Sequence, residues 1–198
     1  MSSYPPSRAR LSEFGYRLMR ELDAVDGIDE ILVLADESGP KVEKCGEKTT
    51  IFRTWRPDDP VSIFLLIFKL LRLRPDVVHF NMNFFSMGNS RVANLVGLCL
   101  IPICRVLGFR VVTTFHYFGT GANLEEFGVK NSWLNRLGLI LGKFLATRAH
   151  VTVSLVKNLL GTLKNLLFVP HGAVNLMGNC ASSNNCNNNS AVLFFGFL

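Results

Sequence analysis

The feature that most constrains the fold of this chain is the alternation of short apolar runs with longer segments of helical periodicity. Residues 30–35, 76–81 and 110–117 are runs rich in Val, Leu and Phe, as expected of strands covered on both faces. The segments between them carry apolar residues at spacings of three and four, which is typical of helices with one buried face. Strands separated by helices pair in parallel through right-handed crossovers. The sequence therefore predicts an α/β fold, a doubly wound parallel sheet with helices on both faces.

The elements expected along the chain include an interrupted helix and an incomplete first strand. Ser12 is placed to cap the first helix, because a Ser oxygen accepts hydrogen bonds from the free N–H groups at a helix start. Pro102 is expected to kink or break the third helix. Only Ser2–Tyr4 stands where a doubly wound sheet has its first strand, so that strand is either vestigial or lost. The expected helices cover 12–24, 61–73, 89–107, 131–148 and 154–163, and the expected strands 30–35, 49–55, 76–81, 110–117, 151–153 and 166–169.

The end of the sequence indicates a domain boundary. Residues 179–190 form a polar tract, half of it Asn, and 191–198 (AVLFFGFL) then has the pattern of a buried strand. Eight residues cannot supply the neighbouring strands that such a strand needs. We therefore expect one Rossmann-like domain over 1–178, a linker over 179–190, and the first strand of a truncated second domain over 191–198. An activity that needs both domains is not expected of these 198 residues alone.

Charge and cysteine content narrow the class of partner and the compartment. The net charge of +6 and the isoelectric point of about 9.3 favour an anionic partner, such as a phosphorylated small molecule or lipid headgroups, although solvated surface charge is the alternative. We do not expect nucleic acid as the partner. The five cysteines include no CxxC pair, so no metal site and no disulfide framework is predicted and a reducing cytoplasm is the expected location.

Two apolar runs raise the question of membrane contact. Residues 61–71 and 92–104 both fall short of the roughly 20 apolar residues that a spanning helix needs. The helix over 62–74 (SIFLLIFKLLRLR) is apolar with a basic end, a pattern that suits peripheral binding to the cytoplasmic face of an anionic membrane. The alternative is a core helix whose basic last turn complements the helix dipole.

An ordered set of segments resembles the family 4 (group 1) glycosyltransferases. No single segment is specific, but the set spans essentially the whole chain in the order that the family has. The segments are YPPS at 4–7, SEFGYRLMREL at 12–22, RPDVVHFN at 74–81, RVVTTFHYF at 110–118, AHVTVS at 149–154, LFVPHG at 167–172 and AVLFFGFL at 191–198.

The resemblance implies a GT-B architecture, in which two Rossmann-like domains face each other across a cleft. It implies an enzyme that transfers a sugar from a nucleotide-sugar donor to an acceptor hydroxyl with retention of the anomeric configuration. The donor is a co-substrate, and neither a cofactor nor an essential metal is implied. The N-terminal domain of the family mostly holds the acceptor, which here would be a glycan, a lipid-linked molecule or a small molecule. Donor binding would come mainly from the second domain.

Residue roles follow from the resemblance at three places. His116 matches the family's histidine that contacts the donor sugar near the reacting centre, and it is the candidate catalytic residue; the alternative is a strand-end histidine that bonds only to backbone. Ser7, Arg8 and Arg10 stand where the family has a Gly-Gly loop close to the donor phosphates. This stretch has no glycine, so guanidinium groups would meet phosphate instead, unless they are surface charges. His171 and Gly172 match the hinge between the two domains.

Three further residues are acceptor candidates from their position after a strand. Asn81 and Asn83 offer amide groups for acceptor hydroxyls, and Phe84 offers a ring for a sugar or lipid. In the same strand His79 is expected to be a packed, hydrogen-bonded core residue.

Two rival classes are weighed against sugar transfer. A nicotinamide or flavin domain would need GxGxxG, and Gly119-Thr120-Gly121 lacks both the third glycine and an acidic residue about 20 positions further on. The other rival is a non-catalytic half-domain that binds an acceptor, a membrane surface or a partner chain supplying the second domain.

Overall fold

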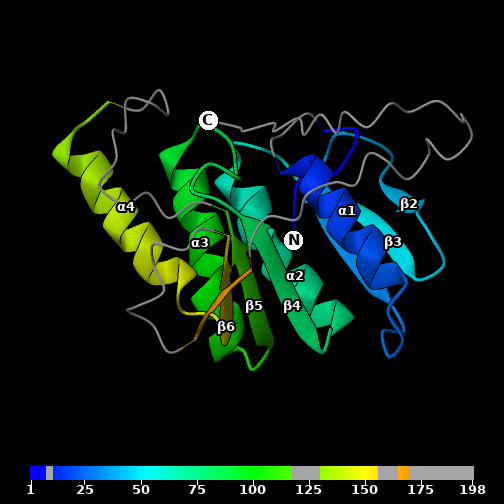
Figure 1. Ribbon diagram of the computed structural model, residues 1–198. Helices are drawn as coiled ribbons and strands as arrows, with labels where there is room; N and C mark the ends of the chain where they lie inside the picture. The colour runs from blue at the N-terminus through cyan, green and yellow to red at the C-terminus, as the bar shows by residue number, and fades with distance from the viewer. Residues whose placement is uncertain (8–10, 117–129, 156–164, 170–198) are drawn as a thin grey trace, which may run out of the picture.

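The computed structural model describes residues 1–7, 11–116, 130–155 and 165–169, and it has the α/β fold that the alternation predicts (Figure 1). The predicted helix over 154–163, the linker, the final strand and the hinge lie outside these residues, apart from the first two positions of that helix. The helices are α1 Ser12–Asp23, α2 Pro60–Leu73, α3 Arg91–Val106 and α4 Trp133–Ala146. The strands are β1 Ile31–Asp36, β2 Val42–Lys44, β3 Thr49–Trp55, β4 Val77–Met82, β5 Arg110–Phe115, β6 Val151–Ser154 and β7 Leu166–Phe168.

Two groups of strands make up the sheet structure. The order β4-β5-β6-β7 is parallel throughout, with Asn81 opposite Thr114 in the register of β4 and β5. In the second group β1 pairs with β3 in parallel, while β2 pairs with β3 in antiparallel fashion. The prediction of a parallel sheet is confirmed for these pairs, but β2 was missed. All three residues of β2 are exposed, so it carries no apolar run that would mark it as a strand.

The N-terminal residues join the two groups of strands. On one side the Met1 amine donates to the His79 carbonyl at 2.6 Å, and the Asn81 N–H donates to the Met1 carbonyl at 3.0 Å. On the other side the Ser2 N–H donates to the Leu34 carbonyl at 3.4 Å. Residues 1–4 therefore lie between β1 and β4.

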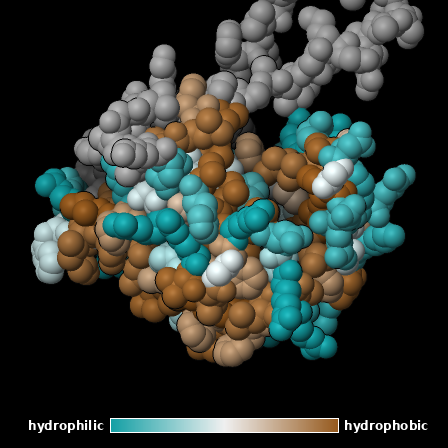
Figure 2. Space-filling view, turned by 90° about the horizontal axis from the view of Figure 1, so that it is seen from below, coloured by the Kyte–Doolittle hydropathy of each residue, from teal (hydrophilic) through white to brown (hydrophobic). Residues whose placement is uncertain are grey.

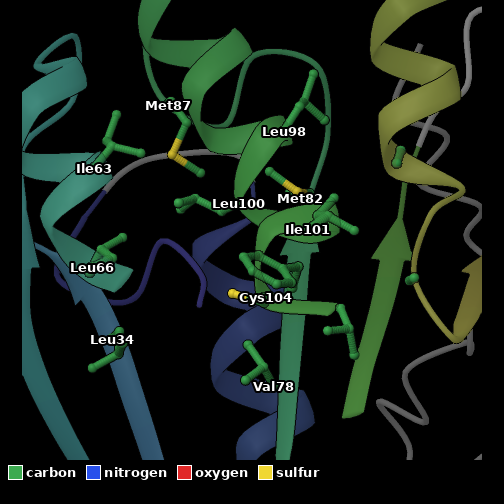
Figure 3. Packing of buried hydrophobic residues seen from close by; sticks show 14 of the residues in the cluster. Leu34, Ile63, Leu66, Val78, Met82, Met87, Leu98, Leu100, Ile101 and Cys104 are labelled. Atoms are coloured by element: carbon green, nitrogen blue, oxygen red, sulfur yellow. The ribbon is translucent and has the colours of Figure 1, made fainter. Parts of the chain in front are cut away.

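Alternation of side chains along β1 divides the core between the two faces of the sheet. Val33 and Ala35 pack with Tyr16 and Met19 of α1, whereas Leu34 packs with α2 and α3. Figure 3 shows side chains from α2, α3, β1 and β4 converging in this second and larger part of the core. Helices therefore cover both faces, with α1 on one and α2 and α3 on the other (Figure 1).

Caps begin three of the four helices as their sequences suggest. Asp59 accepts hydrogen bonds from the N–H groups of Val61 and Ser62, Ser90 accepts from Ala93, and Ser132 accepts from Asn135. The prediction of Ser12 as a cap was wrong. Leu11 occupies the cap position of α1, and Ser12 is the first helical residue, its hydroxyl buried without a hydrogen-bond partner.

Helix α3 continues through Pro102 to Val106, so the expected break does not occur. Proline removes one backbone donor from a helix. Packing of α3 between α2 and α4 compensates for this loss, because the stability of a helix in a protein comes mainly from its buried faces. Among the described helices, none has the length and apolar character needed to cross a bilayer.

Candidate functional site

A row of polar side chains lies on the α1 face of the sheet, at the carboxyl ends of β4 and β5. Phe80 and Phe115 point toward the large core, so the alternating positions Asn81 and His116 point the other way. His116 Nε2 lies 2.6 Å from Asn81 Oδ1. In the parallel register Asn81 is opposite Thr114, and His116 lies two residues further along, just beyond the end of β5.

The Asn81 amide connects His116 to the N-terminal segment. Asn81 is buried, and its Nδ2 donates to Ser2 Oγ at 2.9 Å. Ser2 Oγ in turn donates to the Ser3 carbonyl at 2.7 Å. This order of donors leaves Asn81 Oδ1 as the acceptor, so we assign the proton between the two side chains to His116 Nε2. In the neutral ring Nδ1 is then the nitrogen that can accept a hydrogen bond.

Helix α1 holds the other side of the His116 ring. Phe14 meets the imidazole edge to face, with ring centroids 4.4 Å apart and planes at 90°. One residue later, a Cβ on Gly15 would lie 2.7 Å from Ser2 Oγ, so only glycine permits this approach of α1 to the N-terminal segment. His116 is thus oriented both by a hydrogen bond and by packing. Sequence reasoning singled out His116 but gave no role to Phe14, Gly15 or Ser2.

His79 lies in the same row, two residues before Asn81 on the same face of β4. Its Nε2 is 2.9 Å from Thr114 Oγ1. Burial lowers the pKa of His79 to about 4, and repulsion from the charged forms of the Met1 amine and His116 acts in the same direction. His79 is therefore a neutral, packed residue, in keeping with the sequence analysis.

We expect the free energy of unfolding to fall as the pH is lowered from 7.5 to 5. The unfolded histidine takes up a proton near its ordinary pKa of about 6.5, whereas the folded His79 resists protonation until about pH 4. Stability is therefore present above pH 6.5 and is lost as the pH falls through this window, by roughly 2 kcal/mol at pH 5. Urea unfolding at several pH values measures the slope. His79→Gln should reduce the slope without abolishing it, because the buried Met1 amine, whose pKa is lowered to about 5, contributes a slope of the same sign. Equal slopes in both proteins would disprove the assignment.

A pocket of about 940 Å³ lies between α3 and α4, beyond the carboxyl end of β4. Two of the predicted acceptor residues, Asn83 and Phe84, line it, whereas Asn81 and His116 do not. Its other walls are mostly apolar, with a few amides near the strand ends. Representative lining residues are Leu11, Leu98, Leu137 and Leu141 on the apolar side and Asn94 and Asn135 on the polar side.

The loop after β4 is held in place by an amide side chain of its own and by one from α3. Asn83 Oδ1 accepts from the Phe85 N–H at 2.8 Å, and Phe84 is buried against the Phe115 ring at a centroid distance of 4.9 Å. At the far end of the loop, Asn94 accepts from the Met87 N–H and donates to the carbonyls of Gly88 and Ser90. The pocket therefore has a fixed rim.

A buried arginine holds the backbone of Tyr4 and Pro5 in place. Arg53 Nη1 donates to the Tyr4 carbonyl at 3.1 Å, and Nη2 donates to the Pro5 carbonyl. The neighbouring Asp36 carboxylate accepts from the Tyr4 N–H at 3.2 Å. Sequence reasoning missed Arg53. The available signal was a charged residue at an inward position of β3, in line with the buried Ile51 and Trp55.

The remaining site predictions stay predictions. Ser7 donates its N–H to the Tyr4 carbonyl at 3.1 Å, and Arg8 and Arg10 lie outside the described residues, as do His171 and Gly172. Within the described ranges, no three His, Cys, Asp or Glu side chains gather as a metal site would require. No protein-family model, no curated protein and no solved structure matches this chain.

Proposed function

We propose that this chain is the acceptor-side, Rossmann-like domain of a GT-B glycosyltransferase that uses a nucleotide sugar and retains the anomeric configuration. One observation carries the proposal. His116 is the residue matched by the family resemblance, and it is held by Asn81 and Phe14 at the carboxyl ends of parallel strands. In open α/β sheets this edge is where ligands bind.

Sugar transfer requires that the donor sugar is oriented and that the charges of the transition state are stabilised. As the nucleoside diphosphate departs, negative charge develops on its oxygen and positive charge on the sugar. A neutral imidazole with a fixed ring plane hydrogen-bonds a sugar hydroxyl and holds the anomeric carbon in line for reaction. In this proposal Arg8 and Arg10 supply cationic groups for the phosphates, and the second domain supplies most of the nucleotide site.

The pocket between α3 and α4 serves as the acceptor side of the same proposal. Its amide groups near the strand ends suit a hydroxyl-bearing head, and its apolar walls suit an acceptor with a hydrocarbon part. A lipid-linked acceptor therefore fits the lining better than an unmodified glycan does.

A second candidate is a half-domain that binds its acceptor or a partner chain without turnover. The observation that favours it is the large apolar surface that α2, α3 and α4 expose, which indicates that another body covers this part of the chain.

The test uses the protein purified at its native length from its own cells, so that further segments and partner chains are retained. We expect release of nucleoside diphosphate from at least one of a panel of UDP-, GDP- and ADP-sugars, dependent on a membrane or glycan extract as acceptor. Because no metal is implied, release should persist after treatment with EDTA. Acceptor binding without any nucleotide release would support the non-catalytic candidate instead and overturn sugar transfer.

A further inference from the structure

Three neighbouring helices expose apolar side chains where a surface helix normally carries polar ones. On α4 the exposed residues recur at spacings of three and four, with Trp133 76% and Ile140 68% exposed. A helix that is apolar on both its inner and its outer side is normally buried on both sides. We name the exposed set the outer helical face. Its members are Val61, Phe64, Leu65, Phe68 and Leu71 of α2, Val92, Leu95 and Val106 of α3, and Trp133, Leu134, Leu137, Ile140, Leu141 and Phe144 of α4.

The outer helical face belongs to one layer of the molecule. α2 packs against α3, and α3 packs against α4. The inner sides of α2 and α3 hold the core residues Leu66 and Leu100. Helix α4 packs closely on α3, because a Cβ added to Gly142 would lie 3.1 Å from the Leu98 side chain. Figure 2 shows one face of the molecule, on which hydrophobic residues gather in the lower and central part and hydrophilic residues run across the middle and along the right side. Because the three helices are neighbours, their exposed apolar side chains offer adjoining surface to one partner.

The charges on these helices have one sign. Neither Asp nor Glu occurs in α2, α3 or α4, although each contains two cationic residues. A Lys or Arg stands in the last turn of each helix, where it also complements the helix dipole. The cations are Lys69, Arg72, Arg91, Arg105, Arg136 and Lys143.

We propose that the outer helical face binds the surface of an anionic lipid bilayer. Apolar side chains that enter the headgroup boundary and cations that meet anionic headgroups are the two contributions that hold interfacial helices on membranes. A second copy of this chain is a poorer occupant, because two such faces would bring like charges together. Trp133 suits this location, since Trp prefers the boundary between water and lipid.

Membrane binding extends the sequence prediction for the helix over 62–74 to all three helices, and it does not depend on sugar transfer. It also predicts that the pocket opens toward the membrane. Val92, Leu95, Leu137 and Leu141 both line the pocket and belong to the outer helical face. A bound bilayer would therefore lie at the mouth of the pocket.

The native tryptophans allow a direct test with vesicles of phosphatidylcholine, alone or with about a third of phosphatidylglycerol. Of the two, Trp55 is buried and Trp133 is exposed, so Trp133 reports contact. We expect the full chain to co-sediment with the anionic vesicles, with a blue shift of Trp133 emission and quenching by brominated lipid. Trp133→Phe should lose this signal and still sediment. Failure to sediment with anionic vesicles at low salt would overturn the proposal.

Paired variants separate this face from general electrostatic attraction. Phe68→Glu with Ile140→Glu changes only exposed positions and should weaken vesicle binding at least tenfold, with an unchanged circular dichroism spectrum. Arg136→Glu with Lys143→Glu should also weaken it, whereas the same change of net charge in α1, Arg17→Glu with Arg20→Glu, should have little effect. Equal losses in both charge variants would overturn the proposal. So would dimerisation in solution that these face variants abolish while vesicle binding stays unchanged.

Discussion

We expect His116→Ala to lower kcat for sugar transfer at least tenfold while the fold is retained. His116 is only half-buried, so its removal leaves no large cavity, but it takes away the group that orients the donor sugar in the proposed function. A tenfold loss corresponds to about 1.4 kcal/mol of transition-state stabilisation, which one positioned hydrogen bond can supply. Steady-state kinetics on the native-length protein, with thermal unfolding in parallel, measure both expectations.

His150 provides the matched control for the loss of a histidine. It lies just before β6, at the opposite end of the sheet, where its Nδ1 accepts from the Val111 N–H at 3.1 Å. His150→Gln should leave kcat close to that of the unchanged protein. A wild-type rate in His116→Ala, or an equal loss in both variants, would remove His116 from the site.

A variant of Asn81 tests whether this residue positions the His116 ring for catalysis or only supports the fold. Asn81→Asp places a carboxylate against the imidazole of His116, where it favours the charged ring. We expect the pH profile of kcat to shift in this variant, because a cationic ring has no nitrogen left to accept a hydrogen bond. A variant with an altered rate but an unchanged pH profile would show that Asn81 acts only through packing.

Arg53→Met should cost about 3 kcal/mol of unfolding free energy, the largest stability effect that we expect from one side chain. The Arg53 side chain is 1% exposed and donates to the carbonyls of Tyr4 and Pro5. Methionine fills a similar volume but leaves these buried carbonyls without donors. Urea unfolding monitored through the buried Trp55 measures the loss.

Arg56 is the matched control, because it is an arginine three positions further along the same segment. Its ion pair with Glu37 at 2.7 Å is largely exposed to solvent. Arg56→Met should therefore cost much less unfolding free energy than Arg53→Met does, as is usual for surface ion pairs. If both variants lose the same stability, the bonds of Arg53 to the N-terminal segment contribute little beyond those of a surface pair.

The sequence predicted best those helices and strands whose apolar period and end residues lie within a few positions of one another. The range of β3, Thr49–Trp55, agrees residue for residue, and α2 begins one residue before the predicted start and ends where predicted. In both cases an apolar period is bounded by a clear stop or cap, such as the Asp59 cap before α2. The family resemblance pointed to His116 and position at a strand end pointed to Asn81, and their roles stay predictions.

The errors arose where the deciding contact is distant in sequence. β2 forms only because β3 offers it an edge, and α3 is not broken at Pro102 because two helices flank it, whereas a kink there stays a prediction. Likewise the pairing of Ser2 with Asn81 joins residues 79 positions apart. No window along the chain contains such pairs, so periodicity and propensity cannot reveal them.

The sequence by itself determined the α/β class, most of the element boundaries and the strand end that carries His116, because hydrophobic period and caps act over a few residues. Only the tertiary structure decided that residues 1–4 lie between β1 and β4 and that Asn81 and Phe14 orient His116. It also placed the apolar sides of three helices together on one exposed layer. Those outcomes depend on which distant segments become neighbours, and that is settled by packing and hydrogen bonding of the whole chain.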